Sequence, residues 1–170
     1  MSSTRSTPSG GNIEPGTSHA RAARAGAATT QPLQIDVRGP RFAAAVTSIV
    51  LAVVVLTGSP WLLAVQVAVF AVGALLGVQA SPYGVLFRRV VRARLGPAVE
   101  FEDPRPPRFA QAVGLGVTGT GLVLALAGVS GAVVVSAAVA LIAALLNAVF
   151  GLCLGCEMYV RIVRLTSAAR

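Results

Sequence analysis

Two long stretches without charge dominate the pattern of this 170-residue chain. Residues 42–87 form 46 consecutive positions without Asp, Glu, Lys, Arg or His, and residues 109–156 form 48 more. About 20 helical residues cross a bilayer core about 30 Å thick, so each stretch is long enough for two crossings. Gly58-Ser59-Pro60 and Gly128-Val129-Ser130-Gly131 interrupt the stretches as turns between spans do. The pattern predicts an all-α integral membrane protein with four transmembrane helices, at about residues 42–58, 61–80, 109–127 and 132–152.

The composition supports a membrane domain over residues 34–165. Hydrophobic residues make up 55% of the chain, and only 12% of it is charged, against about 25% in a typical soluble domain. A small soluble fold needs more polar surface than this, so the composition excludes that class. Residues 1–33 are rich in Ser, Thr, Gly, Ala and Pro and lack an apolar period, which predicts a disordered cytoplasmic tail.

The positive charges indicate an orientation in the membrane. All 14 basic residues are Arg, and none of them lies in the two short turns. They lie before the first span, in a basic cytoplasmic loop at 88–108, and after the fourth span. The positive-inside rule predicts a multi-pass plasma-membrane protein with both termini in the cytoplasm. Residues 88–94 are expected to form a short basic helix on the lipid bilayer. Topology therefore accounts for the net charge of +8, and no nucleic acid partner is expected.

The two apolar halves begin with similar motifs. Arg38-Gly-Pro-Arg41-Phe42 recurs 67 residues later as Arg105-Pro-Pro-Arg108-Phe109. Two further strings recur in the same order, one around residues 73–77 and 143–147 and one around 89–92 and 161–164. Because each half holds two spans, the halves are predicted to be parallel hairpin repeats, related by a pseudo-twofold axis along the membrane normal. The alternative is two unrelated hairpins of similar composition. The Arg residues of the motif are expected at the lipid headgroups.

Small and amide residues are expected to hold the spans together. Gly73 and Gly77 form a G-x-x-x-G pair in the second span, and the third span carries four more glycines. Gln66 and Asn147 are expected to form hydrogen bonds between helices. The string Gly114-Leu-Gly-Val-Thr-Gly119 matches a dinucleotide fingerprint, but no strand precedes it and no acidic residue follows at the required spacing. No cofactor is therefore expected. No ionisable residue lies within the spans, which disfavours driven transport and leaves a passive channel or carrier as a minor alternative.

The only two cysteines, Cys153 and Cys156, stand three positions apart at the end of the fourth span. Residues at i and i+3 of a helix share one face, so the two thiols can meet. A redox dithiol, a sulfur carrier, half of a metal site in a homo-oligomer, and simple packing all remain open, and no metal site is expected within one chain. Reactive thiolates usually lie at a helix N-terminus, whereas this pair follows a span and precedes Glu157. Gly151 and Gly155 would remove that difficulty if they broke the helix, so that Cys153 capped a new one. Positive charge is expected from Arg161, or from Arg88 and Arg89.

The chain resembles the small bacterial membrane proteins known as domain of unknown function 4395. The resemblance covers about residues 33–165 and rests on the Arg-x-Pro-Arg-Phe motif and two further strings: Ser81-Pro-Tyr-Gly-Val-Leu-Phe-Arg88 and Gly151-Leu-Cys-Leu-Gly-Cys-Glu-Met-Tyr159. It brings no catalytic residues with it. Genes of this family are often found beside thioredoxin-like and rhodanese-like proteins, so the resemblance implies such a cytoplasmic partner. Abundant Arg, Ala and Gly without Lys is similar to the usage of GC-rich actinobacteria.

Two functions follow as expectations. The first is a membrane-anchored thiol redox or sulfur-transfer partner that uses Cys153 and Cys156. The second is a non-catalytic membrane scaffold or subunit whose basic loop recruits a cytoplasmic partner. Whether the protein is an enzyme is left open by its sequence.

Overall fold

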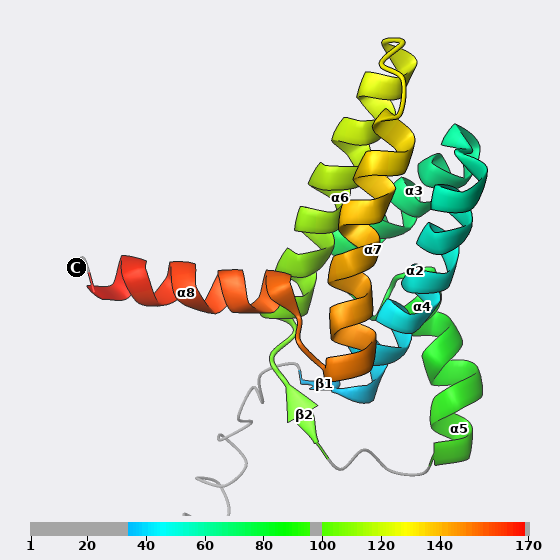
Figure 1. Ribbon diagram of the computed structural model, residues 1–170. Coiled ribbons are helices and arrows are strands. Elements are labelled where there is room, and N and C mark those ends of the chain that lie inside the picture. Colours follow the sequence, from blue (N-terminus) through cyan, green and yellow to red (C-terminus); the bar gives the residue numbers. More distant parts are fainter. Residues whose placement is uncertain (1–33, 96–99, 169–170) are drawn as a thin grey trace, which may run out of the picture. The chain divides into compact units, whose positions relative to one another are not determined.

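Helices form almost all of the regular structure in the computed structural model, which describes residues 34–95 and 100–168 (Figure 1). The all-α fold expected from the sequence is confirmed. The predicted tail at 1–33 lies outside the described residues, as do positions 96–99 of the basic loop and 169–170.

Four long helices form the body of the fold: α2 (Arg38–Thr57), α3 (Pro60–Leu76), α6 (Arg105–Leu126) and α7 (Ala132–Phe150). Of these, α2, α6 and α7 are long and apolar enough to cross a membrane. Helix α3 has 17 residues and is apolar but shorter, with a length of about 26 Å at 1.5 Å per residue. These lengths and compositions are consistent with a membrane protein.

The helix ends differ from the expected span limits for local reasons. Helices α2 and α6 begin earlier, at Arg38 and Arg105, because the prolines that follow stand in the first turn, where a missing N–H is tolerated. Helix α3 ends at Leu76 rather than near residue 80, because Gly77 takes a φ of 96° that ends the helix. Helix α7 ends at Phe150, where Gly151 has a φ of 70°.

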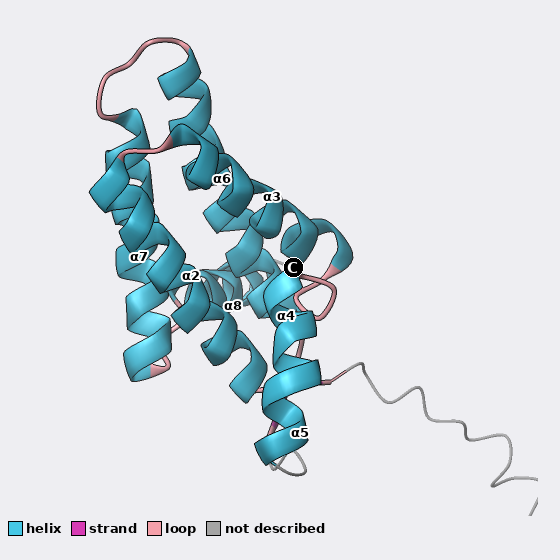
Figure 2. Ribbon diagram, turned by 90° about the vertical axis from the view of Figure 1, so that its right-hand side faces the viewer, coloured by secondary structure: helices cyan, strands magenta, loops and turns pink. Residues whose placement is uncertain are grey.

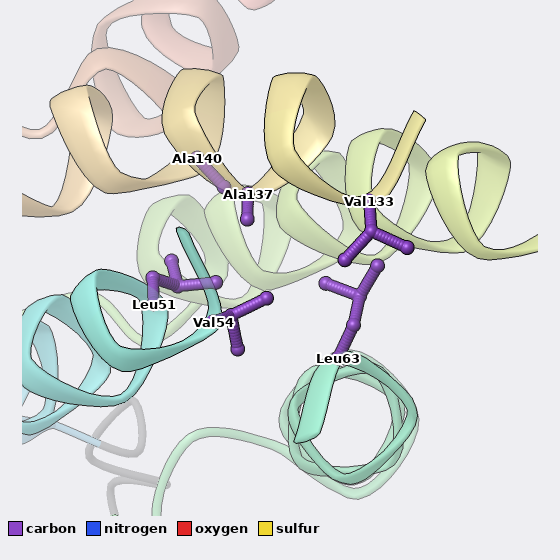
Figure 3. Packing of buried hydrophobic residues seen from close by; sticks show 6 residues of the cluster. All are labelled: Leu51, Val54, Leu63, Val133, Ala137 and Ala140. Carbon is purple, nitrogen blue, oxygen red and sulfur yellow. The ribbon is translucent and has the colours of Figure 1, made fainter. Parts of the chain in front are cut away.

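Each long helix packs chiefly on a helix from the other half of the sequence. Helix α2 lies mainly against α7, and α3 lies mainly against α6, while the neighbours α2 and α3 contact each other less. The short α2–α3 and α6–α7 turns lie at one end of these helices, and the segments that lead into α2 and α6 lie at the other (Figures 1 and 2). The buried apolar core joins three helices, with Leu51 and Val54 from α2, Leu63 from α3, and Val133, Ala137 and Ala140 from α7 (Figure 3).

Only some of the expected packing glycines form close helix contacts. A Cβ on Gly121 would collide with the side chain of Ser136, and one on Gly114 would lie 3.0 Å from the Phe70 ring. Gly116 and Gly119, in contrast, have no atom within 4 Å of that position. Gly73 packs against the side chain of Gln111. For the other member of the expected pair, Gly77, an added Cβ would meet nothing within 4 Å, and this residue terminates α3.

A short antiparallel ladder joins the segments that lead into α2 and α6. Strand β1 (Ile35–Asp36) pairs with β2 (Phe101–Glu102), with Ile35 opposite Glu102. Beside each strand a carboxylate supports the helix that follows. Asp36 Oδ1 accepts from the Arg38 N–H at 3.0 Å, and Asp103 Oδ1 accepts from the Arg105 N–H at 2.8 Å. The starts of α2 and α6 are therefore held side by side.

Two helical segments leave the body at this same end. The first comprises α4 (Pro82–Leu86), a π-helical turn η1 (Phe87–Val91) and α5 (Arg92–Leu95), so the expected basic segment at 88–94 is helical. The second is α8 (Leu154–Ala168), which runs across the direction of α6 and α7 (Figure 1). Its first turns pack against α6.

Candidate dithiol site

A tight turn between α7 and α8 positions the cysteine pair. The Gly151 N–H donates to the Asn147 carbonyl at 3.0 Å, and the Leu152 N–H donates to the Leu146 carbonyl at 3.2 Å. Gly151 is left-handed, with a φ of 70°, and its bond to the Asn147 carbonyl is the αL motif that closes a helix. The new helix begins at Leu154. The cysteines therefore lie at the N-terminus of α8 and do not continue the fourth predicted span.

Cys153 caps α8 with its sulfur. The Cys156 N–H donates to Cys153 Sγ at 3.3 Å, and the Glu157 N–H donates to the Cys153 carbonyl at 3.0 Å. A helix N-terminus carries partial positive charge and stabilises a thiolate. A Cβ on Gly155 would lie 2.5 Å from the Cα of Ala110, so glycine is needed for the first turn of α8 to rest on α6. The helix break that a reactive Cys153 requires is therefore present.

Cys153 and Cys156 are joined by a disulfide. Their Cα atoms lie 5.2 Å apart, inside the range of about 4.4–6.8 Å that disulfides require. Both residues are half-buried. The pair has the geometry for thiol–disulfide chemistry.

The basic residue beside the dithiol loop is one that the sequence assigned elsewhere. Arg41 Nη2 donates to the Val149 carbonyl at 3.5 Å, and Arg41 Cζ lies 3.7 Å from the Cβ position of Gly151. A cation at the C-terminus of α7 offsets the negative end of that helix. Arg41 thus lies at the dithiol loop rather than only at the headgroups. Its role was missed because residues 41 and 149 are distant in sequence.

A cavity of about 850 Å³ opens beside the cysteines, between α2, α6 and α7. Both cysteines line it, and so do the charged residues Arg88 and Glu102. Burial raises the pKa of Glu102 above its ordinary value of 4.5, and the charge of Glu100 raises it further. Most of the remaining wall is apolar.

The two amide side chains that were expected to link helices have different surroundings. Gln66 is fully buried and accepts from the Tyr83 hydroxyl at 2.8 Å, so its expected role is confirmed. Asn147 was expected in the same role; within residues 34–95 and 100–168 its side chain forms no hydrogen bond, and it lines the cavity. The long α7 places this amide beside the space between helices, and its sequence pattern could not reveal that.

The residues of the repeated motif take matching positions in both halves. Arg108 Nε and Nη2 donate to the carbonyls of Ala74 and Leu75, each at 2.6 Å, as Arg41 does at the end of α7. The Phe42 ring lies 5.7 Å from the Phe87 ring, and the Phe109 ring lies 5.7 Å from the Tyr159 ring. Arg38 and Arg105 donate their backbone N–H groups to the preceding aspartates.

No group of three or more His, Cys, Asp or Glu side chains that could hold a metal ion occurs in the described part of the chain.

The fold and the site together are those of a small α-helical protein with helices of membrane-spanning length and a disulfide at one end of them. The chain belongs to the family described as domain of unknown function (DUF4395), which matches residues 35–164. The resemblance found in the sequence is thereby confirmed. No curated protein and no solved structure matches the chain.

Proposed function

We propose that this protein is a four-span plasma-membrane protein whose Cys153–Cys156 pair exchanges disulfides with a cytoplasmic thioredoxin-like or rhodanese-like protein. The observation that carries the proposal is the cap geometry, in which Cys153 Sγ accepts the Cys156 N–H at 3.3 Å while both sulfurs lie within bonding reach. That arrangement stabilises a thiolate next to the thiol that can resolve it.

Four spans are supported by the way α3 packs. With 17 residues, α3 is at the lower limit of about 17–25 residues for a membrane crossing. It lies along α6, and its Leu63 belongs to the same core as residues of α2 and α7. The Arg-free turns lie together at one end, which supports a cytoplasmic location for the other end and for both termini.

A parallel repeat is supported by the register of the small ladder. Ile35 pairs with Glu102, which is 67 residues further on, the same separation as between Arg38 and Arg105. A twofold axis through the Ile35–Glu102 pair exchanges these two residues and maps Asp36 onto Asp103, so this register is consistent with a twofold repeat. The same rotation maps the α2–α7 contact onto the α6–α3 contact. It also maps the Phe42–Phe87 pair onto the Phe109–Tyr159 pair.

The exchange itself needs only the two sulfurs and a partner dithiol. A partner thiolate attacks Cys153 Sγ, the S–S bond breaks, and Cys156 leaves as a thiolate that takes a proton. The partner's second thiolate then attacks the mixed disulfide and releases Cys153. The partner ends oxidised by two electrons, and the pair ends reduced by two.

Thiol trapping tests the proposal. With the resolving thiol removed, Cys156→Ser should accumulate a mixed disulfide between Cys153 and a cytoplasmic protein, seen as a reductant-sensitive adduct on non-reducing gels. Cys153→Ser should accumulate much less, and the double variant none. Identical behaviour of all three variants would contradict the proposal.

A non-catalytic scaffold is the second candidate, because Ser81 performs the same capping in the first half. The Gly84 N–H donates to Ser81 Oγ at 3.2 Å, as the Cys156 N–H does to Cys153 Sγ. This likeness favours a capping role for Cys153 that needs no redox chemistry. Retention of full cellular function by the Cys153→Ser, Cys156→Ser double variant would select the scaffold.

A further inference from the structure

The cavity beside the dithiol reaches from the polar end of the fold into its apolar interior. Its volume of about 850 Å³ lies within the range of about 300–1,000 Å³ that is typical of small-molecule and cofactor sites. Arg88 and Glu102 line it, and so do Thr47 and Val117, which stand near the middle of the apolar helices α2 and α6. One space therefore connects the cysteines with the level of the proposed spans.

Exposed residues of α7 form part of the wall of the same cavity. Val139 and Ile142 line it, and they are also 52% and 61% exposed. They belong to one of the helices that are long and apolar enough to cross a membrane. Exposed apolar side chains on such a helix face lipid, so a ligand dissolved in the bilayer can enter from the side.

Two amides give this apolar wall hydrogen-bond donors. Gln111 of α6, which also packs on Gly73, and Asn147 of α7 line the cavity, and in the described part of the chain neither side chain forms a hydrogen bond. Each amide carries two N–H donors. Donors in an otherwise apolar wall suit a ligand that is mostly apolar and carries carbonyl oxygens.

The dithiol also needs a route for its electrons. Cys153 and Cys156 are the only cysteines among the 170 residues, so the reduced pair cannot pass electrons to a second thiol pair in the same chain. The cytoplasm keeps thiols reduced, so an oxidant must re-form the disulfide. A membrane-soluble molecule with carbonyl oxygens that accepts two electrons and two protons is a quinone.

We propose that this cavity binds a lipid-soluble quinone, which oxidises the Cys153–Cys156 dithiol. The inference rests on the proposed function and adds the electron acceptor of the same site. Two S–H bonds break and the S–S bond forms. The two electrons and two protons pass to the quinone, whose carbonyl oxygens become the hydroxyls of a quinol. The quinol then leaves to the bilayer past Val139 and Ile142.

The test uses the full-length protein in lipid nanodiscs, reduced, freed of reductant and kept without oxygen. Decylubiquinone and menadione are added in separate arms, and quinol formation and free thiols are measured. The expected result is one quinol formed and two thiols lost per chain, at a rate that saturates with quinone concentration. The double cysteine variant should form no quinol.

Variants in the cavity locate the reaction. Ala143→Phe fills the cavity and should reduce the rate at least tenfold, whereas Ala112→Phe, at an exposed position of α6 outside the cavity wall, should leave it unchanged. Asn147→Leu removes the amide at similar size and should raise the half-saturating quinone concentration about 2–10-fold. Each variant is also tested for thiol exchange, which reports whether it folds. If Ala143→Phe does not fold, the half-saturating quinone concentration of Asn147→Leu alone tests whether quinone binds in the cavity.

The other outcomes distinguish a failure of the quinone site from a failure of the proposed thiol exchange. Successful trapping of a partner without quinol formation overturns the quinone site and leaves the proposed function intact. Failure of both overturns both. Equal quinone kinetics in the wild type, Ala143→Phe and Asn147→Leu place the reaction outside the cavity. A rate that never saturates indicates a cavity filled by phospholipid acyl chains.

Discussion

Cys153 and Ser81 perform the same local task in different halves of the chain. Each accepts the N–H of the residue three positions later and each precedes a helix that leaves the body of the fold. Sulfur is the weaker acceptor but the only one of the two that can exchange electrons. At the residue scale, two positions separate the halves: Cys153 stands where the first half has Ser81, and Cys156 stands where it has Gly84, so only the second half can form a disulfide.

The Cys153 cap of α8 should contribute to the stability of the folded protein. In reducing buffer, where no disulfide forms, Cys153→Ser should unfold near the wild-type temperature because its hydroxyl still accepts the Cys156 N–H. Cys153→Ala loses the acceptor and should cost about 0.5–2 kcal/mol. Thermal unfolding of the protein in detergent measures both. Equal unfolding of the serine and alanine variants would show that the cap contributes nothing.

The stability of the protein should depend on pH through Glu102. Its pKa is raised above 4.5 by burial, so its charged form is disfavoured in the fold. The stability it contributes is present below about pH 4.5 and is lost as the pH rises through the folded-state pKa. Glu102→Gln should therefore unfold at a higher temperature than wild type at pH 7 and at a similar one near pH 4.

The control for this pair of measurements is Glu100→Gln. Removing that charge relieves only the smaller cause of the Glu102 shift, so its effect should have the same sign and be smaller. A Glu102→Gln variant that is less stable than wild type at pH 7 would refute the assignment.

At the scale of elements, the α6–α7 contact depends on one glycine. A methyl group on Gly121 would meet Ser136, whereas one on Gly119 would meet nothing within 4 Å. Gly121→Ala should cost about 1–3 kcal/mol through overpacking. Gly119→Ala should be neutral or stabilising by up to about 1 kcal/mol, because alanine favours a helix. Unfolding temperatures of the two variants distinguish them, and equal values would contradict the packing.

The start of α8 as a separate helix could not be predicted from the sequence pattern. Leu154, Met158, Ile162 and Leu165 recur at helical spacing along one exposed face. The same residues could have continued the fourth span until charge ended it. The break became certain only with the Gly151 turn and the contact of Gly155 with Ala110.

At the scale of the whole molecule, the arginines predict a topology. Fusions of a reporter after Ser59 and after Ser130 should report the periplasm, because neither turn carries an arginine. Fusions at Gly96 and Arg170, which lie outside the described residues, should report the cytoplasm. A paired phosphatase and fluorescent-protein assay reads both sides, and a cytoplasmic signal at Ser59 would contradict four spans.

The sequence by itself determined the all-helical fold class, the number of long apolar helices and the cysteine spacing. These depend on composition, on the length of uncharged runs and on glycine and proline positions. All of these can be read along the chain without knowing which distant segments meet. The helix starts at Arg38 and Arg105 differed from prediction only because proline is tolerated in a first turn.

Only the tertiary structure decided which surfaces meet. The pairing of α2 with α7, the Ile35–Glu102 register and the position of Arg41 beside the dithiol loop all join residues that are far apart in the chain. The cavity that Asn147 and Cys153 both line arises from the same packing of distant helices. Such contacts depend on the complementary shapes of distant segments, and a local pattern carries no record of them.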